Sequence, residues 1–569
     1  MSGTLPYHTG EGFATAEMAT NPLQNHLVYP QDRRPWISVR RPYLIALIAL
    51  AIGPVIAAWG YYLIFGLPVV PSPRVVAYAG EPHGFPLWLR AAHFINLFLM
   101  VLLVRSGLSI LHDHPRLYWN DHSTPGSDWL RVTPLEVPRD RVWTAKDDSR
   151  YLSPWIGLPG YRHTIGIARY WHFLGAAFWL VNGLIFVALL FGTGQWRRLL
   201  PTDLTIFADA WHVMVHYATF HLPVEPDGFY HYNPLQQLAY AGVVFCIAPL
   251  TLLTGLAMSP AIDNRFLWYP RLFGGRQKAR SLHFLALCGY AAFLVPHVAM
   301  VVITGLRQNM NHIVTGTDDT QATGLIWGLV GLAGIVMACF VAHWVSWHRP
   351  RILQMTFRRV LGPFQKLLVN RWKSRSRYTR ADISPYFWPN GKLPNSQEWL
   401  SLGEGRREGY TLSISGMVEN PMDLTIADLE ELGKQEQITL HHCIQGWSGV
   451  AQWAGLPMAR LVELVRPSPE AGTVVFRSFG EGHYGGAYYD TLTMQNALHP
   501  ETLLAYEMNY QPLPDQHGAP LRLRVENQLG YKMVKWIHAI EFVASPQEVG
   551  RGYGGKNEDD EYYPVVANI

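Results

Sequence analysis

Six long apolar stretches dominate residues 43–347 of this 569-residue chain. A helix needs about 20 apolar residues to cross the hydrocarbon core of a bilayer, and each stretch is close to that length. The stretches cover residues 43–66, 87–111, 167–191, 235–258, 280–305 and 324–347. We therefore predict an all-α membrane helix bundle of six spans. Both ends of the chain then lie on the same side of the membrane, here named the near side.

A seventh apolar segment, 205–222, differs from the six stretches because it carries several ionisable side chains. These are Asp209, His212, His216 and His221. Because charged and imidazole groups are costly in hydrocarbon, we predict that this segment lies at the membrane surface as an interfacial helix or loop.

Basic residues concentrate on the near side of the predicted bundle. They include Arg40 and Arg41 before the first span and a strongly basic stretch, 349–380, after the last. The positive-inside rule then makes the near side cytoplasmic. We expect the basic stretch to lie on anionic lipid headgroups. The first 32 residues are polar, so we expect no cleavable signal peptide. The net charge of +4 gives no indication of nucleic-acid binding.

Four histidines, His93, His172, His283 and His297, lie inside the predicted spans, where an ionisable residue indicates function. His283 and His297 are 14 residues apart in one span, so they share a helix face at a separation of about 21 Å. Because successive spans alternate in direction, His172 and His283 have one depth and His93 and His297 another. This arrangement predicts two haem b groups, each bound by two histidines.

Other interpretations of these histidines remain open. Any single histidine in a span can be a packing residue with satisfied hydrogen bonds. His343 and His348, at the end of the sixth span, are alternative near-side ligands that we expect to be interfacial. His112 and His114 are expected to flank a loop.

The motifs RAAHFIN, SGLSILHDHPRLYWN, RYWHF, YNPLQQLAY, PLTLLTGLAMSP and GGRQKARSLHF occur in this order between residues 87 and 305. They resemble the di-haem cytochrome b subunits of formate dehydrogenases and nickel-iron hydrogenases, especially the thiosulfate-reductase-like branch. The resemblance implies haem ligation by the same four histidines and electron exchange with the quinone pool of a bacterial inner (plasma) membrane. Spans 43–66 and 324–347 are additions to the family pattern. The family orientation would place the C-terminal part outside, in the periplasm, whereas we follow the charge distribution.

Residues after about 380 have an ordinary soluble composition with short alternating strands and Gly/Pro turns. YTLSISGMVENP, TVVFRSF, PLRLRVE and HAIEFVAS predict strands, and Thr425 is a plausible cap for a helix in LTIADLEEL. We predict an α+β domain. The predicted divisions are a polar N-terminal segment 1–42, the membrane domain 43–348, a basic linker 349–380 and the soluble domain 381–569.

Cys443 is the one cysteine outside an apolar stretch, within ITLHHCIQGWSGVAQWAG. The other three cysteines are scattered through the spans, so neither a disulfide framework nor a zinc ribbon is indicated. A lone thiol in a turn rich in Trp and Gly is a candidate soft-metal ligand or nucleophile, and both remain open on these residues alone.

The soluble part contains, in order, ISPYFWPNGKLPNSQEW, LSISGMVENPMDLTIADL, HHCIQGWSGVAQWAGLPMARLVEL, LHPETLLAYEMNYQPLP and GAPLRLRVENQLGYKMVKWIHAIEF. This set resembles the sulfite-oxidase-type molybdopterin domain, most closely the single-domain catalytic subunit of bacterial methionine sulfoxide reductases. The resemblance covers nearly all of 381–545. It implies that Cys443 ligates molybdenum beside a pterin dithiolene.

The same resemblance implies further site residues. Those expected at the pterin and its phosphate are Asn390, Gly518, Arg522, Gly530, Tyr531, Lys532 and Lys535. Candidates for the substrate mouth are Arg477, His483 and Tyr484. The alternatives are an exposed basic turn for the lysines and a structural loop for the mouth residues. We expect the acidic tail NEDDEYYP to be solvated.

These features together predict a membrane-bound oxidoreductase that joins quinone, two haem b groups and molybdenum-molybdopterin. Fusion raises the effective concentration of the two redox domains for one another. We expect quinol to reduce a small S- or N-oxide, with oxidation of sulfite or a similar oxyanion into the quinone pool as the alternative. A different possibility is a haem b electron carrier whose C-terminal domain is a cofactor-free binding module.

Overall fold

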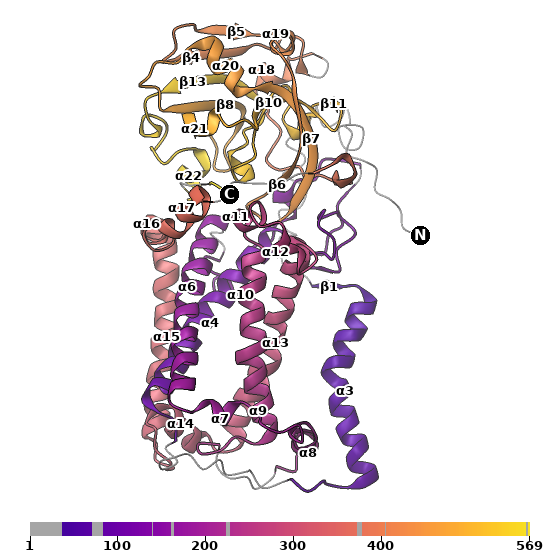
Figure 1. Ribbon diagram of the computed structural model, residues 1–569, viewed down its shortest axis with the longest axis vertical. Coiled ribbons are helices and arrows are strands. Elements are labelled where there is room, and N and C mark those ends of the chain that lie inside the picture. Colours follow the sequence, from indigo (N-terminus) through magenta and orange to yellow (C-terminus); the bar gives the residue numbers. More distant parts are fainter. Residues whose placement is uncertain are drawn as a thin grey trace.

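A computed structural model describes residues 37–70, 84–138, 140–160, 164–222, 228–371, 378–403, 406–564 and 567–569. A long helical bundle forms one end of the molecule, and a β-rich domain sits on the other end (Figure 1). Most of the predicted N-terminal segment 1–42 lies outside the described residues. The predicted order of a helical membrane part followed by an α+β part is confirmed.

Six helices are long and apolar enough to cross a membrane, as predicted. They are α3 (Arg41–Phe65), α4 (Leu87–Asp113), α6 (Ile165–Gly192), the continuous α9–η1–α10 segment, α13 (Arg276–Ile303) and α15 (Thr323–His348). In the fourth of these, α9 (Pro234–Ala241) and α10 (Ala248–Ala257) are joined by a π-helical stretch, η1 (Gly242–Ile247). The chain is a multi-pass membrane protein.

Four of the six spans pack in two pairs. Helix α4 lies along α6, and α10 lies along α13, whereas α3 stands apart from the other spans and contacts α8 (Ile206–Ala218) (Figure 1). Helix α8 has 13 residues, too few to cross a bilayer, in agreement with the prediction for segment 205–222. Helices α7 (Trp196–Leu199) and α14 (Leu306–Val314) also connect spans at this end of the bundle, here named the far side because it is opposite the near side.

A layer of short elements separates the spans from the β-rich domain. It contains strands β1 (Ser38–Val39), β2 (Arg116–Leu117) and β3 (Leu130–Arg131), which form one small sheet. Its helices are α5 (Ala145–Asp148), α11 (Pro260–Asp263), α12 (Trp268–Arg271), α16 (Pro350–Val360), α17 (Gly362–Arg371) and the 3-10 turn η2 (Arg380–Asp382). Arg116 is buried here and donates to both carboxylate oxygens of Asp148 at 2.8 and 2.9 Å.

The C-terminal domain contains two five-stranded sheets. One has the order β5–β4–β13–β8–β9, formed by Met422–Leu424, Leu412–Gly416, Ile537–Val543, Thr473–Glu481 and Ala487–Thr493. The other joins β11 (Gln511–Pro512), β10 (Thr502–Met508), β7 (Ser448–Pro457) and β6 (Gln435–His442), with β12 (Arg522–Val525) also paired to β10. The predicted strands correspond to β4, β8, β12 and β13.

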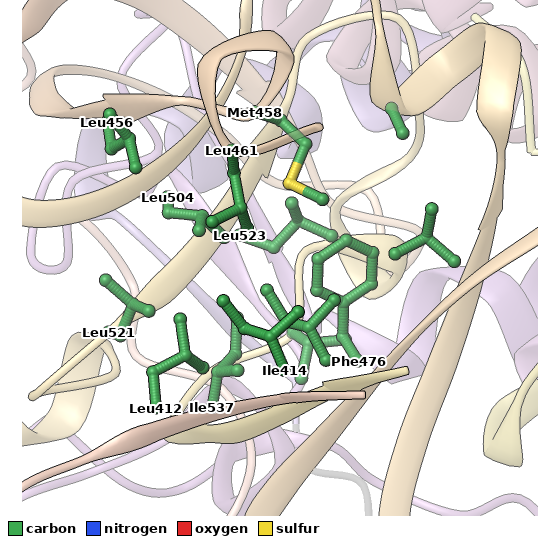
Figure 2. Close-up of a cluster of buried hydrophobic side chains, with 14 of the residues drawn as sticks. Leu412, Ile414, Leu456, Met458, Leu461, Phe476, Leu504, Leu521, Leu523 and Ile537 are labelled. Atoms are coloured by element: carbon green, nitrogen blue, oxygen red, sulfur yellow. The ribbon is translucent and has the colours of Figure 1, made fainter. Parts of the chain in front are cut away.

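The core of this domain lies between the two sheets. Figure 2 shows Ile414 of β4 close to Phe476 of β8 and Leu412 of β4 beside Ile537 of β13, with Leu504 of β10 and Leu523 of β12 in the same cluster. Further helices surround it, namely α18 (Gln397–Leu400), α19 (Ile426–Glu431), α20 (Met458–Val465) and α21 (Met494–Ala497). The predicted cap is present, because the Thr425 side chain accepts from the backbone N–H of Asp428 at the start of α19.

The prediction of a solvated acidic tail is wrong. Helix α22 (Lys556–Asp560) buries Glu558 and Asp559 almost completely. Glu558 accepts from Lys532 Nζ at 2.8 Å, and Arg351 of α16 donates to the Glu558 carbonyl, also at 2.8 Å. Opposite charges that are distant in sequence therefore draw the tail into the interface between the linker and the β-rich domain.

We expect the substitution Glu558→Gln to lower the free energy of unfolding of the β-rich domain by about 3 kcal/mol, because it removes one charge partner from a buried lysine. Urea unfolding of the detergent-solubilised chain, followed by tryptophan fluorescence, measures this loss. The matched control is Glu419→Gln, which breaks an exposed pair with Arg466 and should cost less than about 1 kcal/mol. Equal losses in the two variants would contradict the buried network.

Candidate functional site

The near-side pair of histidines faces one another between two spans. His172 of α6 and His283 of α13 have ring centroids 6.3 Å apart. Because an imidazole nitrogen binds a first-row metal ion at about 2 Å, this spacing leaves room for a single metal ion between the rings. The two histidines would therefore be able to hold the iron of one haem between them.

Hydrogen bonds fix the orientation of both rings. His172 Nδ1 lies 3.2 Å from the carbonyl of Leu103 on α4, and His283 Nδ1 lies 3.1 Å from the carbonyl of Thr251 on α10. A carbonyl can only accept, so each Nδ1 carries the proton and each Nε2 keeps its lone pair for a metal. This is the usual outer-shell arrangement of a metal-binding histidine.

Small residues on the partner helices make space for these rings. A Cβ at Gly107 of α4 would lie 3.2 Å from the His172 ring, and one at Gly255 of α10 would lie 3.6 Å from the His283 ring. Each glycine follows a buried hydroxyl residue that contacts the Nδ1 of the same histidine, Ser106 and Thr254 respectively. The only sign of these contacts in the sequence is the pattern hydroxyl–Gly–Leu, which occurs in both SGLS and TGLA. The pattern alone does not indicate a contact with histidine.

The far-side pair, His93 of α4 and His297 of α13, lies toward the opposite end of the spans. Their side chains are close enough to interact electrostatically. His297 Nδ1 is 3.4 Å from the Tyr240 hydroxyl, and Phe293 stacks on its ring with centroids 5.3 Å apart. The arrangement is compatible with a second haem, with Tyr240 as the outer-shell partner.

The alternative near-side ligands have other contacts. His343 Nε2 lies 2.6 Å from the carbonyl of Pro154, which belongs to the loop after α4. It also contacts the side chain of Arg105 on α4. His348 Nδ1 lies 3.1 Å from the Trp344 carbonyl on its own helix. His343 thus anchors the loop that follows α4.

A cavity of about 290 Å³ opens between the β-rich domain and the near-side layer. Seven of the residues expected at the cofactor or substrate contribute to its walls, namely Asn390, Cys443, His483, Arg522, Gly530, Tyr531 and Lys535. Cys443 follows the end of β6 and is 3% exposed. The fold therefore brings most of the predicted set to one place.

The Cys443 thiol sits in a dry environment with charges nearby. Burial raises the pKa of this thiol to about 12, and the charge of Asp113 adds to the rise. A backbone hydrogen bond from Gln445 and the positive charges of Arg276 and Arg169 lower the pKa and so oppose the rise. A thiolate in this position needs a cation to balance it. A soft metal ion supplies that charge, so the donor fits molybdenum better than it fits a free nucleophile.

Arg522 and Lys535 form a cationic wall of the same cavity. The pKa of Lys535 is lowered, first by burial and then by the charge of Arg522. Arg522 Nε is buried without a hydrogen-bond partner among the described residues. Two adjacent cations, one of them with an unpaired N–H, fit an anionic, hydrogen-bonding ligand such as a pterin phosphate.

Two glycines permit this close packing. Gly518 has φ +121°, and a Cβ there would lie 3.0 Å from Lys535 Cβ. Gly530 lies against His441, whose ring would be 2.3 Å from an added Cβ. The Asn390 amide lies 3.9 Å from the Cys443 sulfur. These positions shape the wall around the thiol.

Lys532 is placed outside the cavity lining. Its Nζ donates to Asp490, to Glu558 at 2.8 Å and to the Gly554 carbonyl at 3.0 Å. This network secures the tail against the domain, and the expected contact of Lys532 with phosphate stays a prediction.

The three candidate mouth residues differ in their relation to the cavity. His483 lines the cavity, whereas Tyr484 is 57% exposed and meets His483 edge-on with centroids 4.8 Å apart. Arg477 of β8 forms an ion pair with Glu541 of β13, away from the lining. Of the three, only His483 is placed to meet a ligand in the cavity.

Sequence reasoning missed the cavity residues that come from outside the β-rich domain. Thr144, Lys146 and Asp147 belong to the loop between α4 and α6, and Asn557, Glu561 and Tyr563 belong to the tail. The capping box formed by Thr144 and Asp147 was visible as T-x-x-D, but it could have predicted only the start of a helix. The location of this helix depends on tertiary packing.

Comparison with known proteins agrees with the division of the chain into a helical bundle and a β-rich domain. Residues 84–316 match the family described as prokaryotic cytochrome b561, and residues 401–549 match the oxidoreductase molybdopterin binding domain. The chain is a fusion of these two domain types. The predicted combination of a haem-binding cytochrome b and a molybdopterin-binding oxidoreductase domain is thereby confirmed.

Individual relatives match part of the chain. A provisionally named protein-methionine-sulfoxide reductase subunit YedZ1 of Azospira oryzae is 34% identical over 27% of this chain and 54% of its own length. The protein-methionine-sulfoxide reductase catalytic subunit MsrP of Campylobacter jejuni is 34% identical over 28% of this chain and 57% of its own. The chain thus spans about half the length of the curated relatives it matches. The sulfane dehydrogenase SoxCD of Paracoccus pantotrophus is 21% identical over 24% of this chain and 39% of its own, with a TM-score of 0.22, too low to support an argument.

We expect His172→Ala to remove one of two b-type haem absorbance signals and to halve the haem content per chain, because one axial ligand is lost. Haem extraction and low-temperature spectra of the purified protein measure this. His343→Ala is the matched control, since that imidazole contacts a loop carbonyl, and it should keep both signals. Haem loss in the control alone would overturn the pairing of His172 with His283.

Proposed function

We propose that this protein is a membrane-bound molybdenum oxidoreductase that uses quinol to reduce a small S-oxide or N-oxide. The observation that carries the proposal is that the loop holding Cys443, which lines the cavity, is hydrogen-bonded to the near-side ends of the helices that carry His172 and His283. A metal-ligating thiol and a haem-ligating pair thereby belong to one connected site. The relatives named as methionine sulfoxide reductases support an S-oxide as substrate.

Two haems b, when bound, supply one-electron carriers at two depths of the membrane. His172 and His283 would hold the near-side haem, and His93 and His297 the far-side one. The protein keeps Nδ1 of each near-side ligand engaged by a carbonyl, which fixes the ring and its tautomer. Within a bilayer the surrounding hydrocarbon would exclude water from both pairs, which suits electron transfer rather than oxygen chemistry.

A molybdenum-molybdopterin cofactor, when bound, supplies two-electron chemistry at an oxygen atom. Cys443 would ligate the metal, while Asn390, Gly530 and Tyr531 would line the pterin pocket. Arg522 and Lys535 would bind its phosphate. His483, at the cavity wall, is placed to orient a substrate or donate a proton to the departing oxygen.

The overall reaction balances without another reactant. Quinol loses two electrons and two protons and becomes quinone. The S-oxide takes up two electrons and two protons. Its sulfur–oxygen bond breaks, and the products are a thioether and water.

We further propose that the near side, and with it the molybdopterin domain, faces the cytoplasm. Support comes from the basic flank at Arg40 and Arg41 before the first span and from exposed basic residues after the last. The latter are Arg358 and Arg359 of α16 and Lys366 of α17. Other near-side arginines, Arg116, Arg276 and Arg280, are buried and make hydrogen bonds inside the protein, so they do not face the lipid headgroups. The charge argument therefore depends on the two flanks, and a periplasmic domain is the alternative.

We expect wild-type protein to contain molybdenum and Cys443→Ala to contain none while it keeps its haem. Quinol-dependent S-oxide reduction should fall by more than about 100-fold, because a direct ligand is lost. Metal analysis per chain and a quinol-oxidation assay measure both effects. Cys288→Ala, which removes a half-buried thiol in a span, is the control and should change neither. Wild-type protein with iron but no molybdenum would instead favour a cofactor-free binding module.

For the orientation, we expect a C-terminal fluorescent reporter that matures only in the cytoplasm to be bright, and a C-terminal alkaline phosphatase, active only in the periplasm, to be inactive. The physical reason is the basic flanks on the near side. The opposite pair of results would place the molybdopterin domain in the periplasm and leave the redox proposal unaffected.

A further inference from the structure

The segment 443–448, here named the Cys443 loop, is seated on the near-side ends of the spans. Gly446 presents its carbonyl to Arg276 Nη1 and to Gln277 Nε2, both at 3.0 Å. Gln445 donates to the carbonyl of Asp113 at 3.2 Å. Loop and helix ends are joined by hydrogen bonds that water does not reach, because Gln277 and Gln445 are buried.

Further contacts extend the seat on either side of the loop. Arg169 Nη1 donates to the Ile444 carbonyl at 3.4 Å. The Gln277 amide also donates to the Ser448 hydroxyl at 3.0 Å, and His442, just before the loop, contacts Asn264 Oδ1 at 2.9 Å. Four of the six residues of the Cys443 loop, and His442 before it, are therefore hydrogen-bonded to the membrane domain.

The helices that provide this seat are the ones that carry the near-side histidines. Arg169 precedes His172 on α6 by about one turn, and Arg276 precedes His283 on α13 by about two turns. The Cys443 loop thus lies one or two helical turns from the proposed near-side haem. A rigid contact at this point keeps the separation between haem and thiol constant.

The membrane domain also supplies charged side chains around the thiol. Charged groups near Cys443 include Asp113 of α4, Arg276 of α13 and Arg169 of α6, and each of these three residues also hydrogen-bonds to the Cys443 loop. None of them belongs to the segment 401–549 that matches the molybdopterin family. The membrane domain therefore supplies the electrostatic environment of a ligand that the other domain contributes.

We propose that Arg276 and Arg169 are positioning residues that couple the two redox centres. This inference rests on the proposed function. The two arginines hold the Cys443 loop on the haem-bearing helices, and they place positive charge beside the metal thiolate. Positive charge favours the more negative, reduced form of a centre, so it raises the reduction potential. Arg276 has the larger effect because it donates at 3.0 Å and is buried, whereas Arg169 donates at 3.4 Å.

The test uses the full-length holoprotein in detergent and begins with iron and molybdenum content. Redox titration of the molybdenum(V) electron paramagnetic resonance signal then gives the potential. Stopped-flow absorbance gives the rate at which an S-oxide reoxidises the dithionite-reduced haem. The variants are Arg276→Gln, Arg276→Lys, Arg169→Gln and the control Arg351→Gln. Arg351 also donates to backbone carbonyls across the domain interface, but to those of Glu558 and Asp559, away from the thiol.

We expect Arg276→Gln to shift the molybdenum potential downward and to slow haem reoxidation several-fold. Arg169→Gln should shift the potential in the same direction by less, and it tests the proposal if Arg276→Gln loses its metal. Arg276→Lys should restore most of the potential, since it keeps the charge. Arg351→Gln should leave potential and rate unchanged.

Two results would overturn the inference while leaving the proposed function intact. One is a metal-loaded Arg276→Gln or Arg169→Gln protein with the wild-type potential and reoxidation rate. The other is an equal change in Arg351→Gln, which would show a general effect of loosening the interface. Absence of molybdenum from the wild type would instead contradict the proposed function itself.

Discussion

The structure depends on how buried arginines at the near-side boundary satisfy backbone carbonyls. Arg276 donates to Met258 and Gly446, and Arg280 donates to the carbonyls of His114 and Arg116. Carbonyls in loops that are excluded from water need donors, and a guanidinium offers five in a fixed plane. These contacts close the loop between α4 and α6, seat the β-rich domain and hold the cavity against the spans.

Joining the two domains in one chain gives more than proximity. The basic linker includes α16, and the acidic tail returns to it through Arg351, so the last residues of the chain fasten the domain to its own linker. The cavity is consequently lined by the membrane-domain loop, the molybdopterin fold and the tail. A separate soluble subunit would have to recreate these contacts at each encounter, whereas here they form during folding.

Particular residues show how far sequence reasoning reaches. The six spans follow from the length of apolar runs, and the Thr425 cap follows from neighbouring residues, because both are local properties. The four histidines were found because charge inside hydrocarbon is rare. Lys532 was expected at the cofactor on the basis of its motif, and the structure adds that its ammonium group forms ion pairs with Asp490 and Glu558. Those partners lie 42 and 26 residues away, so no local pattern could reveal them.

By itself, the sequence determined the spans, the depth of each histidine and the identity of a lone thiol in a soluble domain. Helix periodicity and the cost of burying polar groups in lipid fix these features within single segments. Only the tertiary structure decided that His172 and His283 face one another at 6.3 Å, that Lys146 enters the cavity, and that Arg169 and Arg276 surround Cys443 with positive charge. Each of these depends on side chains from separate helices and loops, whose meeting is set by packing between domains rather than by any local preference of the chain.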